Sequence, residues 1–139
     1  MNKQKIDLQF GLTNELSKKK KIENIFGKLH KTTFTYDNFD FHNNNFFIEL
    51  KTRRINHNRY NSLYFDKCKY DKGLEHLKKG FRVIFIWDCI DRMVLWELKS
   101  DEKVSYFKYG GRTDRGKKEI SNLCNIPTNN LISYNDFKL

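Results

Sequence analysis

One apolar segment, Phe81–Trp87, restricts the folds open to this chain more than any other feature. It is the length of one strand, and its apolar residues are almost continuous, which is typical of a strand buried in the middle of a sheet. A second apolar segment, Met93–Leu98, follows after the short connection Asp88–Arg92. We therefore expect two neighbouring strands inside a sheet that other elements cover.

Two helices are predicted to flank this sheet. The first ends at Gly27, and the residues on one of its faces follow a spacing of four and three: Leu8, Leu12, Glu15, Lys19, Ile22 and Phe26. The second is expected from Leu63 to Lys79, with Gly80 as its stop and Lys67 on its apolar face. Each helix thus carries charge among the residues that should face inward.

The remaining elements are mostly strands. Thr32–Phe41 and Phe46–Arg53 are rich in aromatic and β-branched residues and flank an asparagine-rich turn, which predicts a hairpin. Val104–Tyr109 is a further expected strand, and a short helix is expected from near Asp114 through Leu123, before a short C-terminal strand or coil. The order α, β, β, α, β, β, β, α indicates an α/β protein with a mixed central sheet.

The whole chain has 139 residues, which is enough for a single domain, and no linker or repeat divides it. No apolar run long enough for a membrane span and no secretory signal is visible, so we expect a soluble intracellular protein. Three widely spaced cysteines fit no zinc pattern and are expected to be reduced. The net charge of +10 would attract a polyanion such as nucleic acid.

The predicted hairpin brings charged side chains together. If it closes symmetrically around Asn43–Asn44, Asp40 lies opposite Phe47, and both side chains project to the same face of the sheet. Because side chains alternate along a strand, Glu49 and Lys51 share that face with Phe47. Glu49 then becomes the diagonal neighbour of Asp40. Two carboxylates and one ammonium group are therefore expected to converge.

Two adjacent carboxylates repel each other unless a proton or a cation lies between them, and hard oxygen ligands suit Mg²⁺, with Mn²⁺ as a substitute. Such an ion polarises a phosphoryl oxygen and acidifies a bound water, while a nearby lysine can stabilise developing negative charge. The pattern favours hydrolysis of a phosphodiester bond. The alternative interpretation is that Asp40, Glu49 and Lys51 form the solvated face of an ordinary amphipathic hairpin.

The segment "FDFHNNNFFIELK" resembles the PD-(D/E)XK nuclease superfamily, with Asp40 as the first acid and Glu49-Leu50-Lys51 as the (D/E)XK triplet. "GLTNE" is similar to the GxxxE of the archaeal Holliday-junction resolvases, and this resemblance implies Glu15 as a further ligand. It also implies a restriction-endonuclease-like αβββαβ core. A looser resemblance, through "ELKTRRINHNRY" to "GGRTDRGKKE", is to uncharacterised proteins of large DNA viruses and phages.

The sequence departs from the superfamily pattern at one position and leaves two choices open. Phe39 stands where the motif has proline. Asp37 competes with Asp40, because a turn of odd length would bring Asp37 to the face that carries Glu49. Glu23 is likewise a rival to Glu15 for the acid that the first helix supplies.

Basic and aromatic residues around the motif are predicted to bind DNA. Arginine pairs suit bidentate contact with phosphate, and glycines before arginines expose backbone N–H groups to the same ligand. The predicted nucleic-acid contacts are Arg53, Arg54, His57, Tyr60, Lys67, Arg112 and Arg115.

The expected function is that of a Mg²⁺-dependent endonuclease on DNA, in which Asp40, Glu49 and Glu15 bind metal and Lys51 assists the attacking water. A small basic domain without a specificity module suits recognition of DNA shape, such as a branched junction. A resolvase-like role would imply a homodimer with two active sites. RNA stays open as a substrate, and the alternative is an inactive nucleic-acid-binding or virion protein with the same fold.

Overall fold

The structure is a computed structural model, and it describes residues 16–33, 39–112 and 119–139. Residues 16–26 are helical. The elements that follow are β1 (His30–Lys31), β2 (Phe41–His42), β3 (Phe46–Thr52), β4 (Ser62–Asp66), α2 (Lys67–Lys78), β5 (Arg82–Asp88), β6 (Met93–Glu97), β7 (Ser105–Arg112), β8 (Glu119–Pro127), the 3₁₀ turns η1 (Thr128–Asn130) and η2 (Tyr134–Asp136), and, between those turns, β9 (Ile132–Ser133). The protein is a mixed α/β structure.

A mixed six-stranded sheet with the strand order β1-β2-β3-β5-β6-β9 forms the centre of the described chain. β3 and β5 are parallel and in register from Phe46 opposite Arg82 to Thr52 opposite Asp88. β5 and β6 form an antiparallel hairpin. The strands predicted from the two apolar segments are confirmed, and the tryptophans in them, Trp87 and Trp96, are buried.

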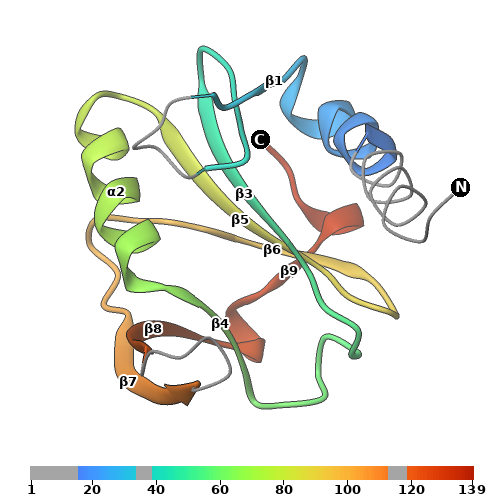
Figure 1. Cartoon of the computed structure of the whole chain (residues 1–139). Coiled ribbons are helices and arrows are strands. Elements are labelled where there is room, and N and C mark those ends of the chain that lie inside the picture. Colours follow the sequence, from blue (N-terminus) through green and yellow to red (C-terminus); the bar gives the residue numbers. More distant parts are fainter. Residues whose placement is uncertain (1–15, 34–38, 113–118) are drawn as a thin grey trace, which may run out of the picture.

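The two helical segments lie on opposite faces of this sheet (Figure 1). On the α2 face, aromatic side chains including Phe47, Phe65 and Phe85 form one core cluster. On the other face, Ile22 and Phe26 of the first helix pack with a second, apolar cluster from β3, β5 and β6. The alternation of β3 divides its side chains between the two clusters, as the sequence predicts.

Two glycines end the helices as expected, and a third brings α2 close to the sheet. Gly27 and Gly80 have φ values of +80° and +93°, in the left-handed region that stops a helix. At Gly73 a Cβ atom would lie 2.7 Å from Leu98 Cδ2, so any larger residue would force the Leu98 side chain to move. Among the described residues, no helix combines the length and the apolar character that crossing a membrane requires.

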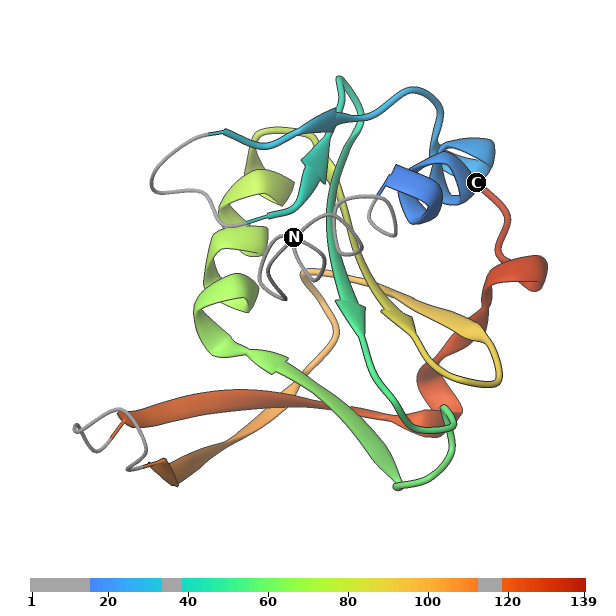
Figure 2. The ribbon, with the colours of Figure 1, turned by 45° about the vertical axis from the view of Figure 1, so that its right-hand side comes forward.

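The second, three-stranded sheet has the order β4-β8-β7, and it corrects two predictions (Figure 2). The helix predicted from Leu63 to Lys79 begins only at Lys67, because Leu63 and Phe65 belong to β4 and pair with β8. The predicted helix through Leu123 is instead strand β8. Asp114, its expected cap, lies outside the described residues. The strand predicted as Val104–Tyr109 is confirmed as β7.

The hairpin before β3 closes one residue later than predicted. Asn43 N donates to Phe46 O, and the Asn43 side chain accepts hydrogen bonds from the N–H groups of Asn45 and Phe46, each at 2.9 Å. Phe41 therefore pairs with Ile48 rather than with Phe46, its partner in the symmetric hairpin. The turn closed by the Asn43 side chain was not part of the predicted symmetric hairpin, and it shifts the β2–β3 register by two residues. Because the shift is an even number, every side chain stays on its predicted face.

The prediction of one continuous strand from Thr32 to Phe41 is also wrong. His30 pairs with His42 and Lys31 pairs with Phe41, so the chain between β1 and β2 reverses its direction. Residues 34–38, which contain the candidate Asp37, lie outside the described residues.

Candidate active site

Asp40 lies at a bend just before β2 and is held by two hydrogen bonds, one from the residue after β1 and one from β3. Its carbonyl oxygen accepts from Thr32 N at 3.0 Å, and its Oδ2 accepts from Leu50 N at 2.8 Å. Continuing the β2–β3 register by one residue places Asp40 level with Glu49. The diagonal arrangement predicted from the symmetric turn is thus replaced by a directly opposed pair.

Glu49 is the most deeply buried acid of this region, with 5% of its surface exposed. Its carboxyl group is hydrogen-bonded to that of Asp40, and its Oε2 lies 2.7 Å from Lys69 Nζ. Burial, followed by the hydrogen bond and the charge of Asp40, raises the pKa of Glu49 to about 8, while Lys69 opposes the shift. The two acids therefore favour a shared proton or a cation between them.

Lys51 lies two residues further along β3 and faces the same side as Glu49. Burial lowers the pKa of its ammonium group, while the carboxylates of Glu49 and Asp66 raise it. Asp66 is the residue before α2, yet its side chain makes no capping hydrogen bond to that helix. Lys51 is thus a partly buried cation whose charge is favoured by two nearby acids, which suits contact with an anionic group.

The helix α2 contributes Lys69 rather than Lys67 to this group of side chains. Lys67 was expected on the apolar face, but its Nζ lies 3.2 Å from both carboxylate oxygens of Asp71 and 5.0 Å from the centre of the Tyr106 ring. The rest of the predicted stripe, Tyr70, Leu74 and Leu77, does pack against the core, but Lys67 is the first residue of α2 and pairs with Asp71 one turn on. Lys69 also lies 5.7 Å from the Phe39 ring centre.

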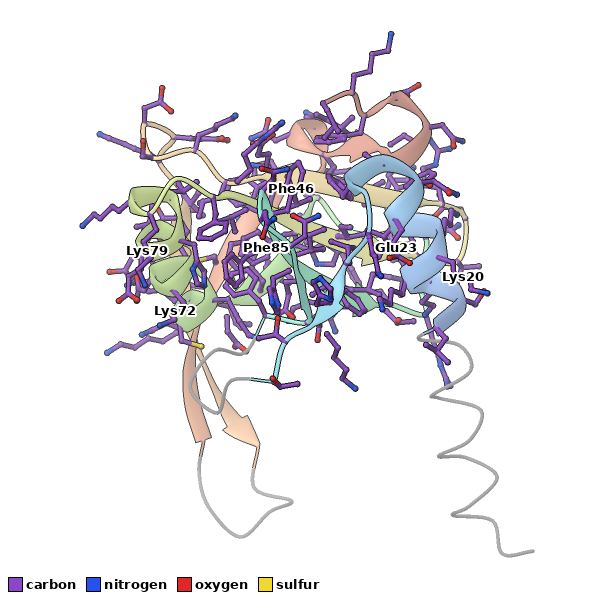
Figure 3. All side chains as sticks on the ribbon, turned by 90° about the horizontal axis from the view of Figure 1, so that it is seen from above. Lys20, Glu23, Phe46, Lys72, Lys79 and Phe85 are labelled. Atoms are coloured by element: carbon purple, nitrogen blue, oxygen red, sulfur yellow. The ribbon has the colours of Figure 1, made fainter. Side chains whose placement is uncertain are left out.

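The first helix does not bring Glu23 to the acids. Glu23 Oε2 accepts a hydrogen bond from Leu29 N at 2.8 Å, which stabilises the chain just after the helix. Figure 3 shows Glu23 and Lys20 on one side of the molecule and Lys72 and Lys79 of α2 on the opposite side. Glu15, the preferred ligand of the two, and Asp37 lie outside the described residues.

The carboxylates of Asp40 and Glu49 provide part of the ligand set that a divalent cation needs. In the part of the chain that the structure describes, no group of three or more histidine, cysteine, aspartate or glutamate side chains could hold a metal ion. Asp40 and Glu49 nevertheless form a pair of hard oxygen donors in which one proton is retained near neutral pH. A divalent cation fits such a pair when water and substrate oxygens complete its coordination.

Three predicted nucleic-acid contacts surround a cavity of about 600 Å³ beside Lys51. Arg53 and Arg54 follow β3 directly and are exposed, and Tyr60 is 55% exposed with the Arg59 guanidinium 5.9 Å from its ring centre. All three line the cavity together with Lys51. The cationic and aromatic groups are therefore close to the acid pair.

His57 is not among the described residues that line this cavity. His57 is tied to the β5–β6 turn, because its Nδ1 lies 2.6 Å from Asp91 Oδ2 and its backbone N donates to Asp91 Oδ1. Arg112 ends β7, although the structure describes only its backbone, and Arg115 lies outside the described residues. Their roles stay predictions.

Two residues of the site escaped the sequence interpretation, namely Asp66 and Lys69. The available signal was the alternation of Leu63, Tyr64 and Phe65, which is typical of a strand and would have moved the helix start to the residue after Asp66. With that start, Asp66 and Lys69 both fall in the turn that enters the helix.

Comparison with known proteins gives one match. A protein-family model described as "Phage putative PDDEXK endonuclease" matches residues 1–133, a span that contains every residue predicted for the site. Neither a search of curated proteins nor a search of solved structures found a match. The resemblance to the PD-(D/E)XK superfamily and to phage proteins is confirmed. The chain belongs to the family described as Phage putative PDDEXK endonuclease.

Proposed function

We propose that this protein is a Mg²⁺-dependent endonuclease that hydrolyses phosphodiester bonds of DNA. The observation that carries the proposal is the pairing of Asp40 with the buried Glu49, next to Lys51 on the same strand. The family description names an endonuclease, which agrees with this chemistry.

The acid pair would hold the metal ion. Leu50 N–H fixes the Asp40 carboxylate, and Lys69 fixes that of Glu49, so both acids are oriented before an ion arrives. When bound, the ion supplies Lewis-acid polarisation of the phosphate and an acidified water. Glu15 is the proposed further ligand.

Lys51 would act on the reacting phosphate. Its ammonium group lies beside the acid pair and is partly shielded from water, where a positive charge interacts more strongly with an anion than it does in bulk solvent. It would donate a hydrogen bond to a non-bridging phosphate oxygen or to the attacking water. The charge of Asp66, which raises the pKa of Lys51, would help to keep this group positive.

The surface around the site favours DNA as the polyanion. The net charge of +10 would draw DNA to the protein, and Arg53 and Arg54 are exposed beside Lys51. Contacts of this kind read the backbone rather than the base sequence. We therefore propose a preference for branched DNA and, by the resolvase resemblance, a homodimer with two active sites.

The alternative is a protein that binds nucleic acid without cutting it. The observation in its favour is the Lys69 ammonium group, which already neutralises Glu49 Oε2 at 2.7 Å. In that case the protein would keep this fold, and Glu49 would only form an ion pair with Lys69 of α2.

Incubation with branched, nicked and linear DNA, in Mg²⁺ or in EDTA, separates the two functions. The nuclease proposal predicts cutting by the wild type only in Mg²⁺ and none by Glu49→Gln. The matched control is Glu75→Gln on the exposed side of α2, which should cut like the wild type. Binding of all three DNAs with no cutting in Mg²⁺ would establish the alternative.

A further inference from the structure

The cavity beside Lys51 lies between the two sheets, and its walls come from distant parts of the chain. β3 and the segment after it supply Lys51, Arg53 and Arg54, while Tyr60, Tyr64 and Phe107 come from the connection to β4, from β4 and from β7. Its volume of about 600 Å³ falls within the range of small-molecule sites, roughly 300–1,000 Å³.

The inner surface of the cavity is aromatic. Tyr64 and Phe107 meet edge to face with ring centres 5.3 Å apart. Phe107 keeps 39% of its surface exposed and Tyr60 keeps 55%, so the cavity opens to solvent and its rings are accessible to a ligand. Exposed aromatic faces of this kind suit a flat, apolar ligand that stacks.

The charge of the cavity has one sign. None of the described residues that line it is acidic, and Lys51, Arg53 and Arg54 are all cations. A ligand that fits must therefore combine a flat apolar face with negative charge at its edge. A nucleotide has this combination, because its base stacks and its phosphate is anionic.

Base pairing decides which nucleotide can enter. In a double helix the base faces are stacked on their neighbours and are not available to a protein cavity. An unpaired nucleotide exposes its base at little cost and can insert it, while its phosphate stays at the rim. Lys51 belongs both to the cavity wall and to the group around Glu49, so a base in the cavity would hold its phosphate near the acid pair.

We infer that this cavity binds the base of one unpaired nucleotide, so that the preferred substrate is DNA with an unpaired nucleotide beside the bond to be cut. The position of the cut rests on the proposed nuclease function. Base binding does not, because it needs neither the metal ion nor the acid pair.

Binding in EDTA, measured by fluorescence anisotropy, tests the inference without cleavage. Three labelled duplexes are compared: one fully paired, one with a single-nucleotide bulge, and one with the same bulge carrying an abasic site. The wild type should bind the bulge with a base about tenfold more tightly than the abasic bulge, since stacking on aromatic side chains has an effect of this size.

The variants Phe107→Ala and Tyr60→Ala should each reduce that preference to about twofold or less, and in Phe107→Ala the affinity for the paired duplex should stay the same. Both side chains are exposed, so their loss should leave the fold intact. Tyr106→Ala is the matched control, because Tyr106 is the neighbouring aromatic residue on β7 and contacts Lys67 rather than the cavity. It should keep the full preference.

Equal affinity of the wild type for the two bulges would overturn the inference, and so would an equal loss of preference in Tyr106→Ala. A protein that prefers the base and yet cuts no DNA in Mg²⁺ would support base binding while refuting the proposed nuclease function. Cutting in Mg²⁺ without a preference for the base would support the nuclease function and refute base binding.

Discussion

The two faces of β3 pack against different helices, and only one of them buries charge. Phe46 and Ile48 face the first helix and join an apolar cluster. Glu49 and Lys51 face α2, where Glu49 is as buried as its apolar neighbours and Lys69 is its ion-pair partner. The apolar face shows that this strand can be stabilised without charge.

Burying an ionisable group costs free energy, and an ion pair offsets this cost only partly. An apolar residue at position 49 would satisfy packing more simply, as Ile48 does on the other face. The difference between the faces therefore supports the proposal that Glu49 and Lys51 are present for chemistry rather than for folding. Changes on the two faces should accordingly have opposite consequences, with loss of activity on one and loss of stability on the other.

The largest effect is expected for Glu49→Gln, which keeps the shape of the side chain and removes its charge. Cleavage in Mg²⁺ should fall roughly a thousandfold, because several kcal/mol of metal-derived stabilisation are lost. Single-turnover cleavage assays measure this, with circular dichroism to show that the fold is kept. Activity within about tenfold of wild type would remove Glu49 from the chemistry.

On the apolar face, Ile48→Ala should lower the free energy of unfolding by about 2–5 kcal/mol, because Ile48 is fully buried and its loss leaves a cavity. Urea denaturation measures this change. Cleavage by the folded fraction should remain close to that of the wild type. If Ile48→Ala abolished cleavage while the protein stayed folded, the separation between the two faces would fail.

The stability of the metal-free protein should depend on pH through Glu49. Its pKa in the folded protein is about 8, above the ordinary value of 4.5, so the folded state holds the proton more tightly than the unfolded state. The stabilisation from this proton is complete below pH 4.5 and is lost as pH rises to about 8.

Denaturation in EDTA across this range should show a decrease in unfolding free energy on the order of 4–5 kcal/mol, because the two pKa values differ by about 3.5 and each unit corresponds to roughly 1.4 kcal/mol. The decrease should be absent in Glu49→Gln, which cannot titrate at this position. A parallel decrease in both proteins would assign the pH dependence to other groups.

The smallest effect is expected from two lysines of α2. Lys69→Met should raise the affinity for Mg²⁺ about tenfold, because the ammonium group beside Glu49 repels a cation. Lys67→Met is the matched control, since Lys67 pairs with Asp71 and should leave the affinity unchanged. Isothermal titration calorimetry measures both values. Weaker Mg²⁺ binding by Lys69→Met would show that Lys69 orients Glu49 more than it competes with the ion.

The central strands could be predicted because a run of consecutive apolar residues indicates a strand buried on both faces. The apolar stretch in Phe81–Trp87 needs no knowledge of its neighbours to be assigned. Leu63 and Phe65 were assigned to a helix because a short apolar run fits both the period of a helix and that of a strand. Their partner strand β8 lies far away in the sequence. Local pattern therefore predicted β7 of the second sheet but not its pairing with β8, or that of β4 with β8.

The site was partly predictable for a related reason. Alternation along β3 is local, so it was enough to place Glu49 and Lys51 on one face, and the two-residue register shift left Asp40 on that face too. Lys69 was missed because it is not on the apolar stripe predicted for α2, and its contact with Glu49 depends on how α2 packs against the sheet, which local pattern does not give.

The most direct test of the account is a crystal of the protein soaked in Mn²⁺ and measured for anomalous scattering. The account predicts one strong peak between the carboxylates of Asp40 and Glu49, and the same map would show whether Glu15 or Asp37 contributes a ligand. A map in which Mn²⁺ binds elsewhere while these two acids keep their mutual hydrogen bond would contradict it.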